Sequence, residues 1–142
     1  MVRRLDGPKF DPPRRSVKEN PTTLRVLVVE AEPLTRWSIS ETLAANGHAI
    51  VEAGDAESAI AVLSDSAVRV DVVLLDLFLP DSHDLSLLAR IRLLSPHSGV
   101  ILMSIDGSTD ASQDALALGA RRVLAKPFDM QDLPRLVEEA GR

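Results

Sequence analysis

The sequence predicts an α/β fold, a three-layer sandwich in which helices cover both faces of a parallel five-stranded sheet. The first indication is the stretch 70–76, where a run of Val and Leu, continuous after Asp71, ends at Asp76. Such a run is typical of a strand that is buried on both faces, as in a parallel sheet. The second is that strand-like and helical segments alternate five times across short connections. The length of 142 residues suits one domain with a modest extension.

Five apolar segments are the expected strands. Each is rich in Val, Ile, Leu or Ala and ends where polar or turn-forming residues begin. In chain order they cover residues 24–30, 49–53, 70–76, 99–103 and 121–125. These patterns alone do not give the order of the strands within the sheet.

The expected helices carry start and stop signals or an amphipathic spacing. Pro33 suits the first turn of the first helix, and Gly47 suits the position just after its end. Asp55 suits the N-cap of the second helix, and Leu and Ile at helical spacing indicate the third. The last helix should begin about two residues before Pro134, because proline is tolerated in a first turn but not further inside. We expect helices over residues 33–46, 56–63, 84–94, 108–118 and 132–142.

Residues 1–23 form a basic, proline-rich extension before a domain that we expect to span residues 24–142. Residues 1–24 carry six cationic and three acidic side chains. They also contain four prolines and few large apolar side chains. This composition is typical of a disordered or extended segment. Two interpretations stay open, a solvated leader and a basic arm that contacts an acidic partner. The cations are not interleaved with aromatic residues, which argues against nucleic acid as that partner.

The composition excludes several classes of site. There is no cysteine, which excludes a disulfide framework, a thiol nucleophile and a cysteine-type zinc site. No apolar run approaches the roughly 20 residues that a membrane-spanning helix needs. The apolar fraction of 45% and the charged fraction of 26% are those of an ordinary globular protein. We therefore expect a cytoplasmic protein without a membrane partner.

Polar side chains stand at the ends of four expected strands. Glu30 ends the first strand, Asp76 the third, Ser104 follows the fourth, and Lys126 follows the fifth. Parallel strands bring their carboxyl ends to one edge, where open α/β sheets bind their ligands. Each residue alone is more often a helix cap or a turn residue. Their joint occurrence makes this edge the candidate site.

The segment from Leu24 to Arg142 resembles the receiver domains of two-component response regulators. The matching stretches are RVLVVE-AEP, DVVLLDLFLPD, VILMSID and GARRVLAKPFD, which carry an Asp, a Ser and a Lys-Pro pair in the family's order. The resemblance implies a flavodoxin-like (βα)5 sandwich with strand order 2-1-3-4-5. It also implies that Asp76 accepts a phosphoryl group, that Ser104 donates a hydrogen bond to it, and that Lys126 supplies a fixed cation. The peptide bond before Pro127 is then expected to be cis.

The metal site departs from the family's pattern. The resemblance implies Mg²⁺ bound by Glu30, Asp76 and the carbonyl of Phe78. The family's usual acidic pair after the first strand is Asp-Asp, however, and here it is Glu30-Ala31. Alanine cannot ligate a metal, so we expect weak Mg²⁺ binding. A second departure is Val123, which stands where family members usually carry an aromatic side chain that moves during signalling.

Two functions remain open at this stage. The first is a stand-alone receiver in a phosphorelay, phosphorylated on Asp76 by a sensor histidine kinase or a histidine phosphotransfer protein. Its effector would be another protein, because no output domain follows Arg142. The second is a degenerate receiver that binds proteins without being phosphorylated. A flavin-binding relative is disfavoured by the acidic pocket and by the aromatic content of 3%.

Two further expectations come from the resemblance. Family members assist only their own phosphorylation and dephosphorylation, so we do not expect an enzyme that acts on an external substrate. Family members also use one face for signalling, which allows a homodimer here through residues 108–118, 121–125 and 132–142.

Overall fold

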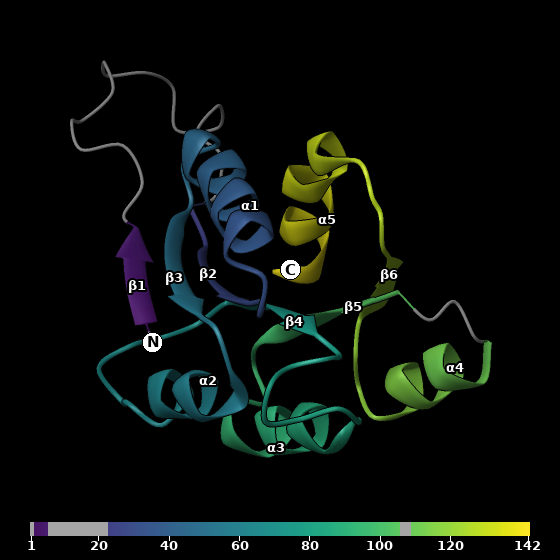
Figure 1. Ribbon diagram of the computed structural model, residues 1–142. Coiled ribbons are helices and arrows are strands. Elements are labelled where there is room, and N and C mark those ends of the chain that lie inside the picture. The colour runs from purple at the N-terminus through teal and green to yellow at the C-terminus, as the bar shows by residue number, and fades with distance from the viewer. Residues whose placement is uncertain (1, 6–22, 106–108) are drawn as a thin grey trace.

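The computed structural model describes residues 2–5, 23–105 and 109–142, and it has a sheet between two layers of helices (Figure 1). The strands are β1 (Val2–Leu5), β2 (Arg25–Val29), β3 (Ala49–Ala53), β4 (Val72–Asp76), β5 (Gly99–Ser104) and β6 (Arg122–Ala125). The helices are α1 (Pro33–Ala45), α2 (Ala56–Leu63), α3 (Ser86–Leu94), α4 (Thr109–Ala117) and α5 (Leu133–Ala140), with a 3₁₀ turn, η2 (Met130–Asp132), before the last.

The sheet order is β1-β3-β2-β4-β5-β6. Among the five strands β2 to β6, every neighbouring pair is parallel. Numbered from β2, these five strands follow the order 2-1-3-4-5, so the predicted flavodoxin-like topology is confirmed. The strand β4 lies between β2 and β5 and all its residues are buried, as its apolar run predicts.

The N-terminal extension differs from the prediction. Residues 2–5, expected to be disordered or extended and to lie outside the folded domain, form β1, which pairs antiparallel with β3 and gives the sheet a sixth strand. Two physical reasons favour the pairing: β3 otherwise has an open edge, and Arg3 stands opposite Glu52 and forms an ion pair with it. Four residues with two arginines show no apolar periodicity, so the pattern gave no sign of this strand. Residues 6–22 lie outside the described ranges.

Two apolar clusters fill the space between the layers. Helices α1 and α5 cover one face of the sheet, and α2, α3 and α4 cover the other (Figure 1). On the first face Val28, Ile39 and Leu133 belong to one buried cluster, and on the second Leu27 and Leu88 belong to another. Because both faces are packed, the C-terminal edge of the sheet is where polar side chains gather.

The helix ends follow the predicted signals with one exception. Gly47 and Gly119, which follow α1 and α4, have φ angles of +92° and +106°, a conformation that favours glycine. Pro134 lies in the first turn of α5, as expected. The exception is α3, expected from residue 84, which begins later because Asp84 accepts a hydrogen bond from the Ser86 N–H at 2.9 Å in a local turn. The expected start of α4, Ser108, lies outside the described residues.

Among the described helices, none combines the length and the apolar character needed to cross a membrane.

His48 lies between α1 and β3 and has no exposed surface. Its Nδ1 accepts a hydrogen bond from the Leu24 N–H at 3.1 Å. Its Nε2 is 3.9 Å from Glu138 and has no hydrogen-bond partner among the described residues. Burial lowers the pKa of His48, and the charge of Glu138 offsets this only in part.

The stability of the fold should therefore decrease in acid. The folded state keeps this imidazole neutral below its ordinary pKa of 6.5, so the unfolded state binds the additional proton. The free energy of unfolding then falls as the pH drops through 6.5, by at most about 1.4 kcal/mol per pH unit for one proton. His48→Asn keeps an acceptor for the Leu24 N–H but does not titrate. Urea unfolding at about pH 7 and about pH 5 should show a smaller loss in the variant; equal losses would contradict the assignment to His48.

Candidate functional site

Asp76 is the last residue of β4, and its side chain is buried at the C-terminal edge of the sheet. Only 7% of the residue is exposed. Its Oδ1 accepts a hydrogen bond from the backbone N–H of Phe78 at 3.2 Å. The turn after β4 therefore fixes the orientation of this carboxylate.

Glu30 follows β2, the strand next to β4, and is 1% exposed. Its Oε2 accepts a hydrogen bond from the Glu32 N–H at 3.0 Å. Its backbone carbonyl accepts one from Arg36 Nη1 at 2.8 Å, and its backbone N–H donates to the Ala53 carbonyl at 3.1 Å. The residue is thus held through both its side chain and its backbone.

Lys126 follows β6 and brings one cation to both carboxylates. Its Nζ lies 2.5 Å from Glu30 Oε1 and 3.5 Å from Asp76 Oδ2. The Lys126–Pro127 peptide bond is cis, as the resemblance implied. A long side chain is needed here, because β5 and β4 lie between β6 and β2 in the sheet.

Ser104 ends β5 and is 3% exposed. Its backbone carbonyl accepts a hydrogen bond from the Lys126 N–H at 2.9 Å. The preceding residue, Met103, pairs with Asp76 across the two strands. The structure therefore brings Asp76, Ser104 and Lys126 to the ends of three adjacent strands, with Glu30 beside them.

The charge balance of this cluster shifts the titration of Asp76. Burial, followed by the hydrogen bond and the negative charge of Glu30, raises the pKa of Asp76 to about 6. The Lys126 ammonium and the Phe78 N–H act in the opposite direction but do not cancel the rise. Two carboxylates and one ammonium thus leave the site acidic, with Asp76 ionised above about pH 6.

The side chains around the implied Mg²⁺ site already have other partners. Of the ligands that the resemblance implied, Glu30 and Asp76 both lie against Lys126. At the second position of the family's acidic pair, Ala31 is half-buried against the apolar cluster. The next carboxylate, Glu32, caps α1 by accepting hydrogen bonds from the backbone of its first turn. Within the described residues, no group of three or more His, Cys, Asp or Glu side chains could hold a metal ion.

Two supporting residues were not predicted from the sequence. Arg36 donates to the Glu30 carbonyl from α1. Asp81, in the loop after β4, accepts hydrogen bonds from the Ala56 and Glu57 N–H groups at 2.8 and 3.1 Å and so caps α2. An aspartate in the loop after β4 and a charged residue on α1 carry no local signal for these contacts, because both contacts depend on the folded arrangement.

This arrangement suits an electrophile that carries negative charge. A carboxylate is a nucleophile when ionised, and a fixed ammonium 3.5 Å away can stabilise anionic oxygens that approach it. A buried serine at the neighbouring strand end lies at the same edge. Phosphoryl groups have the charge and the oxygen atoms that such a site would stabilise.

Comparison with protein families and curated proteins gives consistent matches. A family model described as "Response regulator receiver domain" matches residues 26–138. The response regulator protein FleR of Pseudomonas aeruginosa is 36% identical over 113 residues, which make up 80% of this chain and 24% of that protein. Sporulation initiation phosphotransferase F of Bacillus subtilis is 27% identical over 115 residues, 81% of this chain and 91% of that protein. The chain thus spans only about a quarter of FleR's length but most of the phosphotransferase.

Solved structures resemble the fold closely. The CheY-like receiver domain protein of Methanospirillum hungatei superposes with a TM-score of 0.78 at 24% identity, covering 84% of this chain and 94% of that one. NtrX of Brucella abortus gives a TM-score of 0.73 at 32% identity, covering 84% of this chain and 26% of that one. The first likeness concerns the fold alone, and the second extends to the sequence.

Asp76→Asn should stabilise the folded protein at neutral pH. With a pKa of about 6 in the folded state and 3.8 as the ordinary value, the folded state binds the proton more strongly, so stability is lost as the pH rises through this window. Above it the penalty is of the order of 3 kcal/mol. In urea unfolding with a chelator present, the variant should exceed the wild type in free energy of unfolding by more at about pH 8 than at about pH 5. Exposed Asp114 provides the control, since Asp114→Asn should show no such difference.

Proposed function

Because the chain belongs to the response regulator receiver domain family, we propose that it accepts a phosphoryl group on Asp76 in phosphorelay signal transduction. The observation that supports this most directly is the Glu30–Lys126–Asp76 cluster, in which one ammonium contacts both carboxylates. The cluster stands at the carboxyl ends of β2, β4 and β6, where this class of sheet binds ligands.

The proposed reaction transfers a phosphoryl group from a phosphohistidine. The phosphorus–nitrogen bond of the donor breaks, an Asp76 carboxylate oxygen forms the new phosphorus–oxygen bond, and the imidazole leaves with the electron pair and takes up a proton. Lys126 is positioned to stabilise the anionic phosphoryl oxygens. Ser104 is proposed to donate a hydrogen bond to the same group. The nucleophile must be ionised, a condition met above the pKa of about 6 of Asp76.

Receiver domains generally bind Mg²⁺, but we propose that this chain binds it weakly. Glu30, Asp76 and the Phe78 carbonyl would be the protein ligands. The side chains of the first two already lie against Lys126, so a cation has to compete with an ammonium for both. Ala31 leaves the family's second acidic position without a carboxylate.

Receiver domains interact with kinases and effector domains, and this supports our proposals about partners. We propose that the phosphoryl donor is a sensor histidine kinase or a histidine phosphotransfer protein. The protein that responds to the signal is proposed to be an effector protein. The relative FleR is about four times as long as the matched segment, so the stand-alone arrangement stays a prediction. The homodimer, the cytoplasmic location and the lack of activity on an external substrate also stay predictions.

A second candidate function is a protein-binding receiver that is not phosphorylated. Ala31 and the contact between Lys126 and Glu30 favour it, because together they replace a family metal ligand and occupy another with an ammonium. The two candidates differ in one measurable property, the uptake of a phosphoryl group on Asp76.

A Mg²⁺ titration of phosphoryl uptake from a small-molecule donor tests the first candidate. We expect labelling of the wild type only at high Mg²⁺ and none in Asp76→Asn. Ala31→Asp restores a carboxylate, and losses of supporting ligand contacts already cost roughly 10–100-fold in metal affinity. The Mg²⁺ concentration at half-maximal labelling should therefore fall at least about 10-fold in this variant.

The matched control is Ala31→Asn, which has the same size as the aspartate but no charge and should leave the Mg²⁺ requirement high. Labelling of Ala31→Asp alone, with none in the wild type at any Mg²⁺ concentration, would favour the second candidate function. Strong wild-type labelling at low Mg²⁺ would instead show that Glu30 is a competent ligand.

The conformational response to phosphorylation should be small. Val123 on β6 is half-buried against the apolar cluster that includes Ala115 of α4, and it has no ring that could change position. We expect the change to be carried by Ser104, the residues that follow it and α4, and to be smaller than in relatives with an aromatic residue. Backbone chemical shifts with beryllofluoride, a phosphoryl mimic, test this, with Asp76→Asn as the control. Large shifts centred on Val123 and α5, with Ser104 silent, would count against it.

A further inference from the structure

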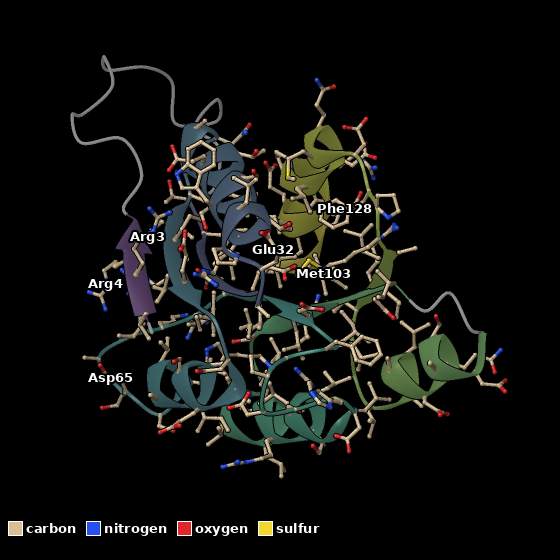
Figure 2. All side chains as sticks on the ribbon, viewed as in Figure 1. Arg3, Arg4, Glu32, Asp65, Met103 and Phe128 are labelled. Atoms are coloured by element: carbon tan, nitrogen blue, oxygen red, sulfur yellow. The ribbon has the colours of Figure 1, made fainter. Side chains whose placement is uncertain are left out.

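A chain of polar contacts leads from β1 to the backbone of Glu30. Its centre is Glu52, a carboxylate on β3 that is only 4% exposed. Glu52 forms an ion pair with Arg3 of β1, and its other carboxylate oxygen lies 3.4 Å from Arg36 Nε. Figure 2 shows Arg3 directed toward β3, whereas Arg4 projects away from the sheet. Because a buried carboxylate is unfavourable unless it is paired, Glu52 depends on both arginines.

Arg36 joins this carboxylate to the candidate site. Its Nε faces Glu52, and its Nη1 donates to the Glu30 carbonyl at 2.8 Å. The guanidinium is planar and rigid, so a displacement of one of its nitrogen atoms also moves the others. Gly54 leaves space for the group, since a Cβ there would lie 3.1 Å from Nη1. The hydrogen bond from Arg36 to the Glu30 carbonyl is therefore sensitive to small displacements on the side of Glu52 and on the side of Gly54.

Glu30 passes any displacement on to the residues around Asp76. Its carboxylate contacts Lys126, which in turn contacts Asp76. Its other carboxylate oxygen accepts the hydrogen bond of the Glu32 N–H at 3.0 Å. The amide of Glu32 is therefore a direct reporter of the position of the Glu30 carboxylate.

We propose that β1 sets the position of Glu30 through Arg3, Glu52 and Arg36, with Arg36 as the positioning residue. With β1 in place, two arginines share the charge of Glu52. Without Arg3, Glu52 draws the guanidinium of Arg36 toward itself and weakens its hydrogen bond to the Glu30 carbonyl. The N-terminal strand thereby supports the site as well as covering the sheet edge.

The coupling acts in both directions. If the position of β1 changes the affinity of the site for a phosphoryl group, a group bound at Asp76 changes the stability of β1 pairing by the same factor. This consequence rests on the proposed phosphoacceptor function, whereas the positioning of Glu30 does not. The only tryptophan of the chain, Trp37, lines a small cavity with Arg3, Arg36 and Glu52. Its fluorescence therefore reports on this junction.

The first experiment compares amide hydrogen exchange in the full chain and in Arg3→Ala, with Arg4→Ala as the matched control. Exchange at Glu32 should become roughly 2- to 30-fold faster in Arg3→Ala, the usual range for a side-chain network acting on a remote site, and stay unchanged in Arg4→Ala. Gly54→Ala should give the same direction of change, because it displaces Arg36 without removing a charge. Amides of Val72–Leu75 serve as the control for intact folding. Changes in Arg3→Ala that are confined to β1 and β3, with Glu32 unaffected, would overturn the proposal, because Arg3 would then only cover the edge.

The second experiment separates this proposal from the proposed function. Beryllofluoride is added to the full chain while Trp37 fluorescence and the amides of β1 and Ser104 are followed. A change at Ser104 together with a change at Trp37 and β1 supports the coupling. A change at Ser104 with Trp37 and β1 silent overturns the coupling and leaves the proposed function intact. If Ser104 is also silent, the proposed function fails, and the positioning of Glu30 is decided by the exchange at Glu32.

Discussion

One ammonium group facing two buried carboxylates is the constraint on which this site depends. Glu30 and Asp76 lie at the ends of neighbouring strands with almost no exposed surface, and without a cation their charges would repel each other in a poorly solvated edge. Lys126 supplies that cation from β6, two strands further along the sheet. The strand order, the tight packing of β4 and the turn that follows β6 are all needed to bring these three side chains together. Burial and the neighbouring Glu30 carboxylate raise the pKa of Asp76 to about 6 in spite of this ammonium. The contacts of Lys126 with both carboxylates are also the reason why a divalent ion would have to compete for its ligands.

Most of the fold could be predicted because its signals are local. The central strands β2, β4 and β5 contain uninterrupted apolar runs, and the glycines after α1 and α4 mark helix ends through backbone geometry that only glycine adopts easily. The strand β1 could not be predicted in this way. Its pairing is decided by the open edge of β3 and by the charge of Glu52 in an otherwise apolar strand. That glutamate was the one available sign that a cation from elsewhere would be found beside β3.

The residues of the candidate site also divide into those that could be predicted from the sequence and those that could not. The positions of Asp76, Ser104 and Lys126 follow from parallel strands that end at one edge, so their convergence could be predicted from the order of the elements alone. The contacts of Arg36 and Asp81 depend instead on which helix face meets which loop. No periodicity or spacing encodes such contacts, because each partner looks like an ordinary surface residue in its own segment. The alanine at position 31 was visible in the sequence, but the contacts of Lys126 with both remaining carboxylates depend on how the strands are arranged in the fold.

The cap that Asp81 provides for α2 bears on how the chain acquires its structure. Two of the first amides of this eight-residue helix bind a carboxylate that lies 25 and 24 positions further along the chain. A helix this short is marginal on its own, and beside its own cap, Asp55, it gains these two hydrogen bonds only when β4 has entered the sheet and the following loop has closed. These contacts therefore couple the stability of the helix to that of the loop after β4. Any event that rearranges the loop after Asp76 also loosens a helix whose own sequence ends well before that loop begins.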